Sequence, residues 1–304
     1  MSFVPVFSSL GDALAEVFGP SVSVSARRAV SGGDINRAYQ LTLSDGTTVF
    51  LKSNAATLLP MFAAEAEGLR AMADTGAIGV PEPRAVGTDP DLGAFLLLDW
   101  IESASAAPGF WEDFGMRLAA FHNADTSAFV PDGRYGYGFS LDNYIGSTPQ
   151  INTPRDTWVA FFRECRLEPQ FRMAFDTGFL DPSARAYSDR LLSRLDALLL
   201  EPGHPALLHG DLWSGNFMTG PDGRAWLIDP ATYVGHREAD LAMTELFGGF
   251  SPAFYSAYKS VAPLQPGYED RRDVYNLYHL LNHVNLFGFS YTGAVMHILT
   301  KYGK

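Results

Sequence analysis

The sequence contains almost no cysteine and comparatively few charged residues, and both shortages narrow what the chain can be. The single cysteine, Cys165, excludes an intrachain disulfide framework and is typical of a reducing compartment. We interpret Cys165 as a small buried apolar group and not as a reactive thiol. Charged residues make up 18% of the 304 residues and hydrophobic residues 47%, which is the balance of a globular chain and not of a disordered one.

Long apolar runs and an excess of basic charge are also missing. No run approaches the roughly 18 to 20 apolar residues that a membrane-spanning helix needs. The N-terminal stretch carries Asp12 and Glu16 and lacks the basic segment with which a signal peptide begins. The formal net charge of −12 disfavours a nucleic-acid partner. We therefore expect a cytoplasmic protein that binds neither a membrane nor nucleic acid.

Hydrophobic patterning divides the chain into a strand-rich first part and a helical second part. A chain of 304 residues is longer than one core usually covers, so two lobes are expected. The alternation of apolar and polar residues predicts strands in the first part, and helical spacing predicts helices over 6–18 and 58–76. The predicted strands lie within 22–30, 31–43, 47–53, 80–87 and 93–102, with a hairpin turn at "SDGTT".

From about residue 103 the pattern becomes mostly helical. The small-residue stretch "ESASAAPG" (102–109) is the best candidate for a lobe boundary, so we assign residues 1–101 and 102–304 to two lobes of an α+β protein. A "GPDGRA" hairpin interrupts the helices of the second lobe. The predicted helices are 109–124, 156–166, 181–200, 237–247, 252–261, 268–287 and 291–302.

The stretch "HGDLWSGN" gathers polar residues in the pattern of a phosphoryl-transfer loop. Protein kinases use H-R-D-L-x-x-x-N, in which the Asp accepts the proton of the substrate and the Asn binds metal. Here Asn216 follows Asp211 at the same spacing, and Asp229 ends the next hairpin strand where the metal-binding Asp of D-F-G would lie. Asn216 and Asp229 would hold Mg²⁺, which prefers oxygen ligands. Taken alone, a D-x₄-N spacing fits equally well a loop whose side chains cap a tight turn.

A lysine and a glutamate in the first lobe strengthen the kinase interpretation. Lys52 follows an apolar run on its predicted strand, where a kinase places the lysine that binds the ATP phosphates and pairs with a helix glutamate. The next helix offers Glu65 and Glu67. The alternative for Lys52 is an edge-strand lysine that discourages aggregation. Lysine, helix glutamate, D-x₄-N and strand-ending aspartate in this order are rarely met by chance.

Three weaker signals complete the predicted nucleotide and acceptor sites. Gly32 and Gly33, in "SGGDIN", would let backbone amides approach the phosphates, although two glycines also suit a simple hairpin. Backbone groups of Asp99, Trp100 and Ile101 could pair with adenine at the hinge between the lobes. Trp213, two residues after Asp211, could stack on a sugar or on an amine, or could belong to the core.

Segments over nearly the whole chain resemble the fructosamine kinase (ketosamine 3-kinase) family. "HGDLxxxN" is shared with aminoglycoside and choline phosphotransferases, whereas "DLWSGN", "STPQ" and "LNHVNLFG" are more specific to ketosamine kinases. One departure is Asp34, which stands where some members carry a cysteine, so thiol-based control by that loop is not expected. The segments that carry the resemblance are 31–39, 50–52, 61–69, 142–152, 161–170, 209–216, 228–250 and 275–288.

The resemblance implies a two-lobed protein-kinase-like fold and an ATP- and Mg²⁺-dependent kinase. It implies that Asp211 acts as the general base, that Lys52 pairs with Glu65, and that Glu67 is an exposed surface charge. Asp240, in "READLAM", resembles the aspartate of the kinase fold that braces the catalytic loop from a following helix. The implied substrate is a small-molecule or protein-linked ketosamine phosphorylated on a sugar hydroxyl. Two alternatives stay open at this level, an aminoglycoside- or choline-type acceptor and a catalytically silent kinase-fold binding protein. The oligomeric state is open as well.

Overall fold

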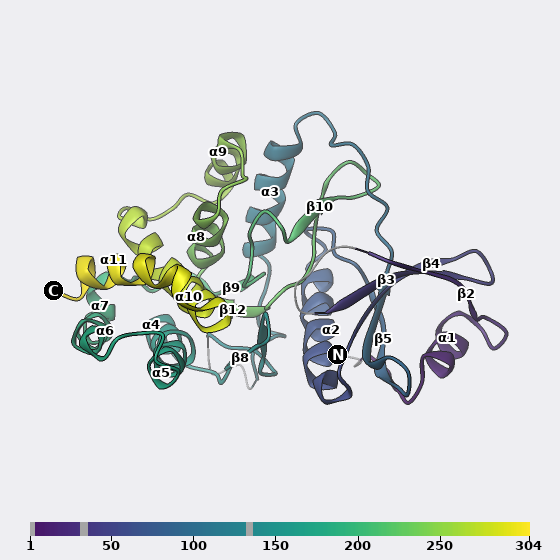
Figure 1. Ribbon diagram of the computed structural model, residues 1–304. Helices are drawn as coiled ribbons and strands as arrows, with labels where there is room; N and C mark the ends of the chain where they lie inside the picture. The colour runs from purple at the N-terminus through teal and green to yellow at the C-terminus, as the bar shows by residue number, and fades with distance from the viewer. Residues whose placement is uncertain (1–3, 31–35, 132–135) are drawn as a thin grey trace. The chain divides into compact units, whose positions relative to one another are not determined.

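The computed structural model describes residues 4–30, 36–131 and 136–304, which form two compact units (Figure 1). The first unit comprises Met1–Phe110 with Met218–Asp229, and the second comprises Trp111–Phe217 with Pro230–Lys304. The first unit thus includes a short hairpin, Met218–Asp229, from much later in the chain. A single cut between residues 101 and 102 would assign this hairpin to the other unit. No helix among the described residues is both long enough and apolar enough to cross a membrane.

The first unit is built on a six-stranded sheet that is antiparallel except at one edge. Hydrogen bonds join its neighbours in antiparallel pairs, and only the edge strand β1 runs parallel to its neighbour β5. Across the sheet the strands are β1 (Val6–Phe7), β5 (Pro83–Asp89), β6 (Gly93–Asp99), β4 (Thr48–Asn54), β3 (Arg37–Leu43) and β2 (Val24–Ala29).

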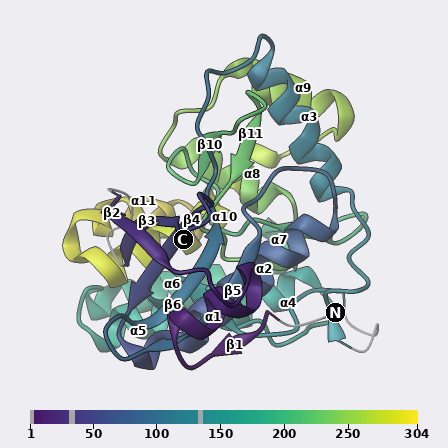
Figure 2. The same ribbon diagram turned by 90° about the vertical axis from the view of Figure 1, so that its right-hand side faces the viewer.

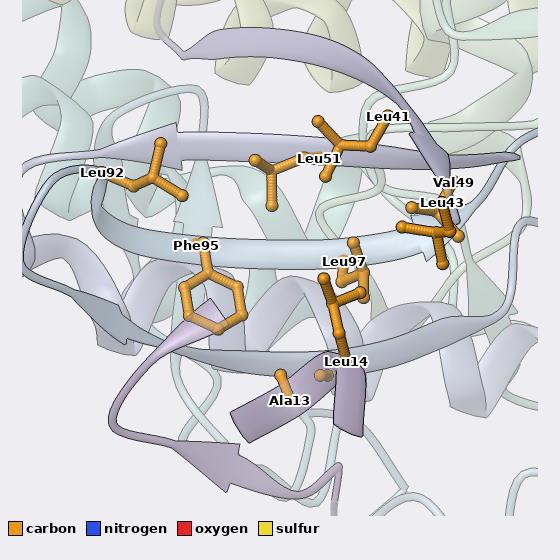
Figure 3. Packing of buried hydrophobic residues seen from close by; sticks show 10 residues of the cluster. Ala13, Leu14, Leu41, Leu43, Val49, Leu51, Leu92, Phe95 and Leu97 are labelled. Carbon is orange, nitrogen blue, oxygen red and sulfur yellow. The ribbon is translucent and has the colours of Figure 1, made fainter. Parts of the chain in front are cut away.

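Strand alternation gives this sheet two different faces. One face packs against the short helix α1 (Leu10–Phe18), whose Ala13 and Leu14 are buried among leucines, one valine and one phenylalanine of the sheet (Figure 3). Because successive side chains of a strand point to opposite faces, Leu51 belongs to this core while Lys52 faces the other side. The longer helix α2 (Leu59–Asp74), preceded by η1 (Ala56–Leu58), covers that other side and carries Glu65.

The second unit is mainly helical, with short two-stranded ribbons between the helices. The long helix α10 packs against α5, α7, α8 and α11 (Figure 1). The helices of the second unit are α3 (Phe110–His122), α4 (Trp158–Phe162), η3 (Arg163–Leu167), α5 (Glu168–Asp176), η4 (Pro182–Ala184), α6 (Arg185–Ser193), α7 (Leu195–Leu198), α8 (Glu238–Leu246), α9 (Pro252–Val261), α10 (Tyr268–Phe287), η5 (Gly288–Tyr291) and α11 (Thr292–Tyr302).

Three two-stranded ribbons position the polar loops, two of them in the second unit. β9 (Ala206–Leu208) pairs with β12 (Tyr233–Gly235), and β7 (Asn143–Ile145) pairs with β8 (Thr148–Gln150). β10 (Phe217–Thr219) and β11 (Ala225–Leu227) form the hairpin predicted around "GPDGRA" (Figure 2). The chain therefore enters "HGDLWSGN" from β9, leaves it into β10, and returns through β11 to Asp229.

The predicted elements are largely confirmed, with local differences. The predicted helix 181–200 is divided into η4, α6 and α7. The predicted helix 6–18 begins only at Leu10, because Ser9 caps it by accepting a hydrogen bond from the Asp12 N–H, while Val6–Phe7 pair with β5. The predicted helix 156–166 is α-helical only to Phe162 and continues as the wider π-helical turn η3.

Candidate active site

Lys52 is a buried cation held between two carboxylates of the first unit. Only 6% of the residue is exposed, and its Nζ donates to Glu65 Oε1 at 2.6 Å and also to Asp229 Oδ1. Burial alone would lower the pKa of Lys52, but the charges of Asp229 and Glu65 raise it above its ordinary value. The ammonium group thus stays charged where burial would otherwise neutralise it. Glu67 is not the exposed charge that we expected, because it is half-buried and accepts a hydrogen bond from the Val4 N–H.

Asp229 combines an accessible carboxylate with an unusual backbone conformation. Its φ of +55° makes it the one non-glycine residue with positive φ among the described residues. Aspartate tolerates this left-handed region better than most residues, and such conformations gather at functional sites. Its side chain is 43% exposed, so Oδ1 contacts Lys52 while the carboxylate stays open to solvent. The group therefore suits a cation that is bound together with a substrate.

Glycines fasten the hairpin that ends at Asp229 to the first unit. The Trp226 ring lies so close to Gly79 and Gly220 that a Cβ at either position would overlap it. The Leu227 N–H donates to the Gly79 carbonyl at 2.8 Å. Both contacts hold the strand two residues before Asp229, which explains how a segment so distant in sequence reaches Lys52.

The turn before Asp211 is braced by Asp240 from the start of α8. Asp240 accepts hydrogen bonds from the N–H groups of His209 (2.7 Å) and Gly210 (2.9 Å). His122 Nε2 lies 3.1 Å from Asp240 Oδ2, and His122 Nδ1 lies 2.8 Å from the Tyr258 hydroxyl. Burial alone would raise the pKa of Asp240, but its contacts with His122 and the loop hold it below its ordinary value. A buried anion therefore fixes the loop.

Gly210 is required by both conformation and space. Its φ is +82°, and a Cβ there would overlap the carbonyl oxygen of Ala231. The Ala231 N–H donates to the His209 carbonyl at 2.8 Å, so residues 209–210 and residue 231 lie against each other. His209 is fully buried, and its Nδ1 accepts from the Asp211 N–H at 3.2 Å. We therefore interpret His209 as a residue that shapes the loop.

Asp211 and Asn216 lie side by side in the second unit. Asn216 Nδ2 donates to the Asp211 carbonyl at 2.8 Å and to Asp211 Oδ2 at 3.1 Å. The turn-capping alternative is thus partly realised, because the Asn216 amide does close the loop. With Nδ2 on Asp211, the oxygen Oδ1 is the Asn216 atom that could bind a metal.

The oxygen donors of this chain fit the way in which Mg²⁺ is bound with a nucleotide. Within the parts of the chain that the structure describes, no three His, Cys, Asp or Glu side chains gather as a metal cage. Mg²⁺ in kinases keeps several waters and takes one or two protein oxygens besides those of the phosphates. Asn216 Oδ1 and the accessible carboxylate of Asp229 are ligands of that kind.

A buried polar network, not foreseen from the sequence, supports the backbone just after Asp229. Gln150 Nε2 donates to the Ala231 carbonyl (3.0 Å), and Asn143 Nδ2 donates to the Thr232 carbonyl (2.8 Å). The Tyr278 hydroxyl donates to Gln150 Oε1 at 2.6 Å. The "STPQ" segment therefore has a visible role, since its glutamine holds the chain next to Gly210.

Arg166 anchors the far side of this network. It is fully buried, and its guanidinium group donates to the Ile151 carbonyl (2.5 Å) and to Asn152 Oδ1 (2.7 Å). It also lies 3.9 Å from the ring centroid of Tyr233. Arg166, Gln150 and His122 each contact residues that lie many positions away in the sequence. Their role could have been inferred only by asking why polar residues occupy otherwise apolar segments.

The remaining predicted residues fall outside these two clusters. The Asp99 carboxylate forms two hydrogen bonds with Arg84 (2.7 and 2.8 Å), and the Asp99 N–H donates to the Glu82 carbonyl. The Trp100 ring lies 6.2 Å from that of Phe50, and no contact tests the predicted adenine pairing of Asp99, Trp100 and Ile101. Gly32, Gly33 and Asp34 lie outside the described residues.

Trp213 is not a core residue. It is 39% exposed, and its indole ring folds over Gly215, where a Cβ would overlap it. The glycine of "DLWSGN" therefore determines how the Trp213 ring lies. Cys165 is buried as expected, its Sγ lies 3.6 Å from the Thr153 carbonyl, and burial raises its pKa.

Comparisons with known proteins agree over almost the whole chain. A family model described as fructosamine kinase matches residues 6–304. A "Probable ketoamine kinase" of Synechocystis sp. is 41% identical over 97% of this chain and 96% of its own length. The chloroplastic "Protein-ribulosamine 3-kinase" of Oryza sativa subsp. indica is 41% identical over 93% of this chain and 80% of its own length.

Solved structures show the same fold. A Thermobifida fusca protein named as a candidate fructosamine-3-kinase superposes with a TM-score of 0.80 and 35% identity, covering 96% of this chain and 97% of its own. A thermostable mutant of an aminoglycoside phosphotransferase, only 18% identical, superposes with a TM-score of 0.62 over 96% of this chain and 99% of its own. The second likeness concerns the fold alone, and it confirms the predicted protein-kinase-like architecture.

Proposed function

This chain belongs to the fructosamine kinase family, and we propose that it transfers the γ-phosphoryl group of ATP to a sugar hydroxyl of a ketosamine. The names of the relatives support both the reaction and the acceptor, and the rice relative's name supports the hydroxyl at carbon 3. The structural observation that carries the proposal is Lys52, buried between Glu65 and Asp229. A cytoplasmic location is part of the proposal, although the rice relative is chloroplastic.

The first unit would hold the nucleotide. Lys52 would bind the α- and β-phosphates while Glu65 keeps its ammonium group in place. Gly32 and Gly33 would approach the phosphates through their N–H groups, and the backbone of Asp99, Trp100 and Ile101 would contact adenine. When bound, Mg²⁺ held by Asp229 and Asn216 would neutralise charge on the phosphates.

The second unit would activate the acceptor. Asp211 would accept the proton of the attacking hydroxyl as the oxygen bonds to the γ-phosphorus and the bond to the β-phosphate oxygen breaks. The Asn216 amide, donating to Asp211 Oδ2, would keep the carboxylate oriented. The brace from Asp240 would prevent the loop from moving during this step.

The test is acceptor-dependent ADP release by the purified protein with ATP and Mg²⁺. We expect turnover with fructosyl-lysine and ribulosyl-lysine and little with kanamycin or choline. A kcat/KM for kanamycin or choline above that for both ketosamines would overturn the acceptor assignment and leave the kinase assignment standing. No ADP release with any acceptor would favour the catalytically silent alternative.

A further inference from the structure

The clearly exposed phenylalanine and tryptophan side chains of the described residues all belong to the second unit. Among the described residues, four phenylalanine or tryptophan side chains are clearly exposed: Trp213 (39%), Phe247 (40%), Phe287 (52%) and Phe289 (69%). Such side chains are usually buried, and an exposed group of them marks a contact surface. The proposed phosphoryl transfer does not explain why these side chains are exposed.

Ring contacts join most of them into one strip. From Trp213 the ring centroids step 6.3 Å to Phe247, 5.0 Å to His283 and 5.5 Å to Phe287. Tyr291 closes the end of the strip, 4.9 Å from His283 and 6.4 Å from Phe287. We call these five residues the aromatic strip. It begins two residues from Asp211 and continues over three ring-to-ring steps, more than one sugar ring needs.

Glycines shape the strip, as they shape the catalytic loop. A Cβ at Gly249 would overlap Ser214, so Gly249 allows the segment after Phe247 to lie against the catalytic loop. Gly288, with φ +79°, ends α10 and turns the chain so that Tyr291 returns to His283. The strip is thus built by backbone turns that other residues would not permit.

The strip carries no charge of its own near neutral pH. Burial lowers the pKa of His283, and its Nδ1 donates to the His279 carbonyl at 2.8 Å. In the neutral ring the other nitrogen, Nε2, is therefore a hydrogen-bond acceptor. Aromatic faces attract ammonium groups, and an acceptor nitrogen among them suits a cation with N–H donors. An anionic group would find no cation in the strip.

We propose that the aromatic strip binds the amine substituent of the acceptor, namely a secondary ammonium group with the hydrocarbon chain of a blocked or peptide-linked lysine. This inference rests on the proposed function, because the sugar end of such an acceptor must reach Asp211. The strip then determines specificity, favouring ketosamines with a long hydrocarbon substituent over those with a short one. Trp213 lies at the sugar end, and Phe287 and Tyr291 lie at the far end.

The experiment compares two acceptors that share one sugar. They are the ribulosamine of Nα-acetyl-lysine amide, which is long, and that of methylamine, which is short. We expect Phe247→Ala and Phe287→Ala to lower kcat/KM for the long acceptor by about fivefold to thirtyfold. The short acceptor and ATP should change less than about twofold. Phe289→Ala is the matched control, since Phe289 is exposed but contacts Phe179 and not the strip.

Equal losses on both acceptors, or no loss on the long one, would overturn the inference. Calorimetric binding of the long acceptor without ATP keeps it separate from the proposed function. If no ketosamine supports ADP release but Phe287→Ala weakens that binding fivefold or more, the proposed reaction fails and the strip stands. If wild type sediments as a dimer and Phe287→Ala as a monomer, the strip is a subunit interface and the inference fails.

Discussion

At the scale of single residues, Asp211 and Lys52 have different proposed roles, so substitutions of the two should change different kinetic constants. Asp211 is partly exposed and oriented by Asn216, whereas Lys52 is buried and holds two carboxylates. A group at the acceptor side affects the chemical step, whereas a group at the phosphates affects both nucleotide use and chemistry. The two variants below separate these roles.

We expect Asp211→Asn to lower kcat by roughly 10²- to 10⁴-fold, the usual effect of losing a positioned general base. The KM for ATP should change less than about threefold. The substitution keeps the size of the side chain, and the Asn216 amide can still donate to an oxygen at this position. Steady-state kinetics measure the effect, with the exposed Asp189→Asn in the same unit as control. A kcat within about threefold of wild type would remove Asp211 from this role.

We expect Lys52→Met to lower kcat/KM for ATP by at least about 10²-fold, because it removes the cation and leaves Glu65 buried without its partner. The buried charge should also make the variant less stable. Lys259→Met, which replaces an exposed lysine of α9, is the control and should keep the stability of wild type. If both variants lost the same stability, the unpaired buried charge of Glu65 would not be the cause of the loss. Unchanged kcat/KM for ATP would exclude Lys52 from the nucleotide site.

The pKa of Lys52 gives this variant a pH signature. Because the folded-state pKa is raised, the stability that Lys52 contributes is fully present below its ordinary value and lost as the pH rises through the raised one. Lys52 should therefore add no titration to kcat/KM between pH 7 and about pH 10. Urea unfolding should show a constant gap over this range between Glu65→Gln and Lys52→Met/Glu65→Gln. The comparison omits Glu65 because burial raises its pKa and it would titrate itself once Lys52 is removed. If this difference in unfolding free energy disappeared as the pH rose from 7 to about 9, the raised pKa of Lys52 would be contradicted.

At the scale of elements, glycines and caps explain where the chain turns. α9 and α10 begin and end where they were predicted, since Ser251 caps α9 and Gly288 ends α10. Local signals of this kind are visible in sequence. β1 and the π-helical turn η3 were missed because the first depends on pairing with β5 and the second on tertiary packing.

Gly210→Ala tests whether the loop needs glycine for conformation alone or also for space. Gly210 and Gly178 both have positive φ, but a Cβ at Gly210 would overlap Ala231 whereas Gly178 faces open space. We expect Gly178→Ala to cost about 1 kcal/mol of unfolding free energy and Gly210→Ala about 2–4 kcal/mol. Urea denaturation measures both. Equal costs would mean that the approach of Ala231 does not constrain the loop.

At the scale of the whole molecule, sequence reasoning found the motif residues and one of their supports, Asp240, but not the other residues that hold them. Lys52, Asp211 and Asn216 carry spacing signals, and so they were identified. The other supports act across long sequence separations, as His122 does on Asp240 and Gln150 does on the Ala231 carbonyl. Nothing in a single sequence specifies which buried polar residue meets which, because that follows from packing of the whole unit.

The net charge of −12 acts on both substrates at once and in opposite directions. A ketosamine whose amine is protonated is attracted by an acidic protein, and free ATP is repelled, so screening by salt weakens both effects. Between about 20 and 200 mM NaCl, near neutral pH, we expect kcat/KM for ribulosyl-lysine amide to fall about twofold to fivefold. kcat/KM for ATP should stay level or rise. A neutral acceptor analogue with an amide in place of the amine is the control and should lose its salt dependence. If kcat/KM for the cationic and the neutral acceptors fell in parallel, the salt would be acting on the catalytic machinery and not on the encounter with the cationic acceptor.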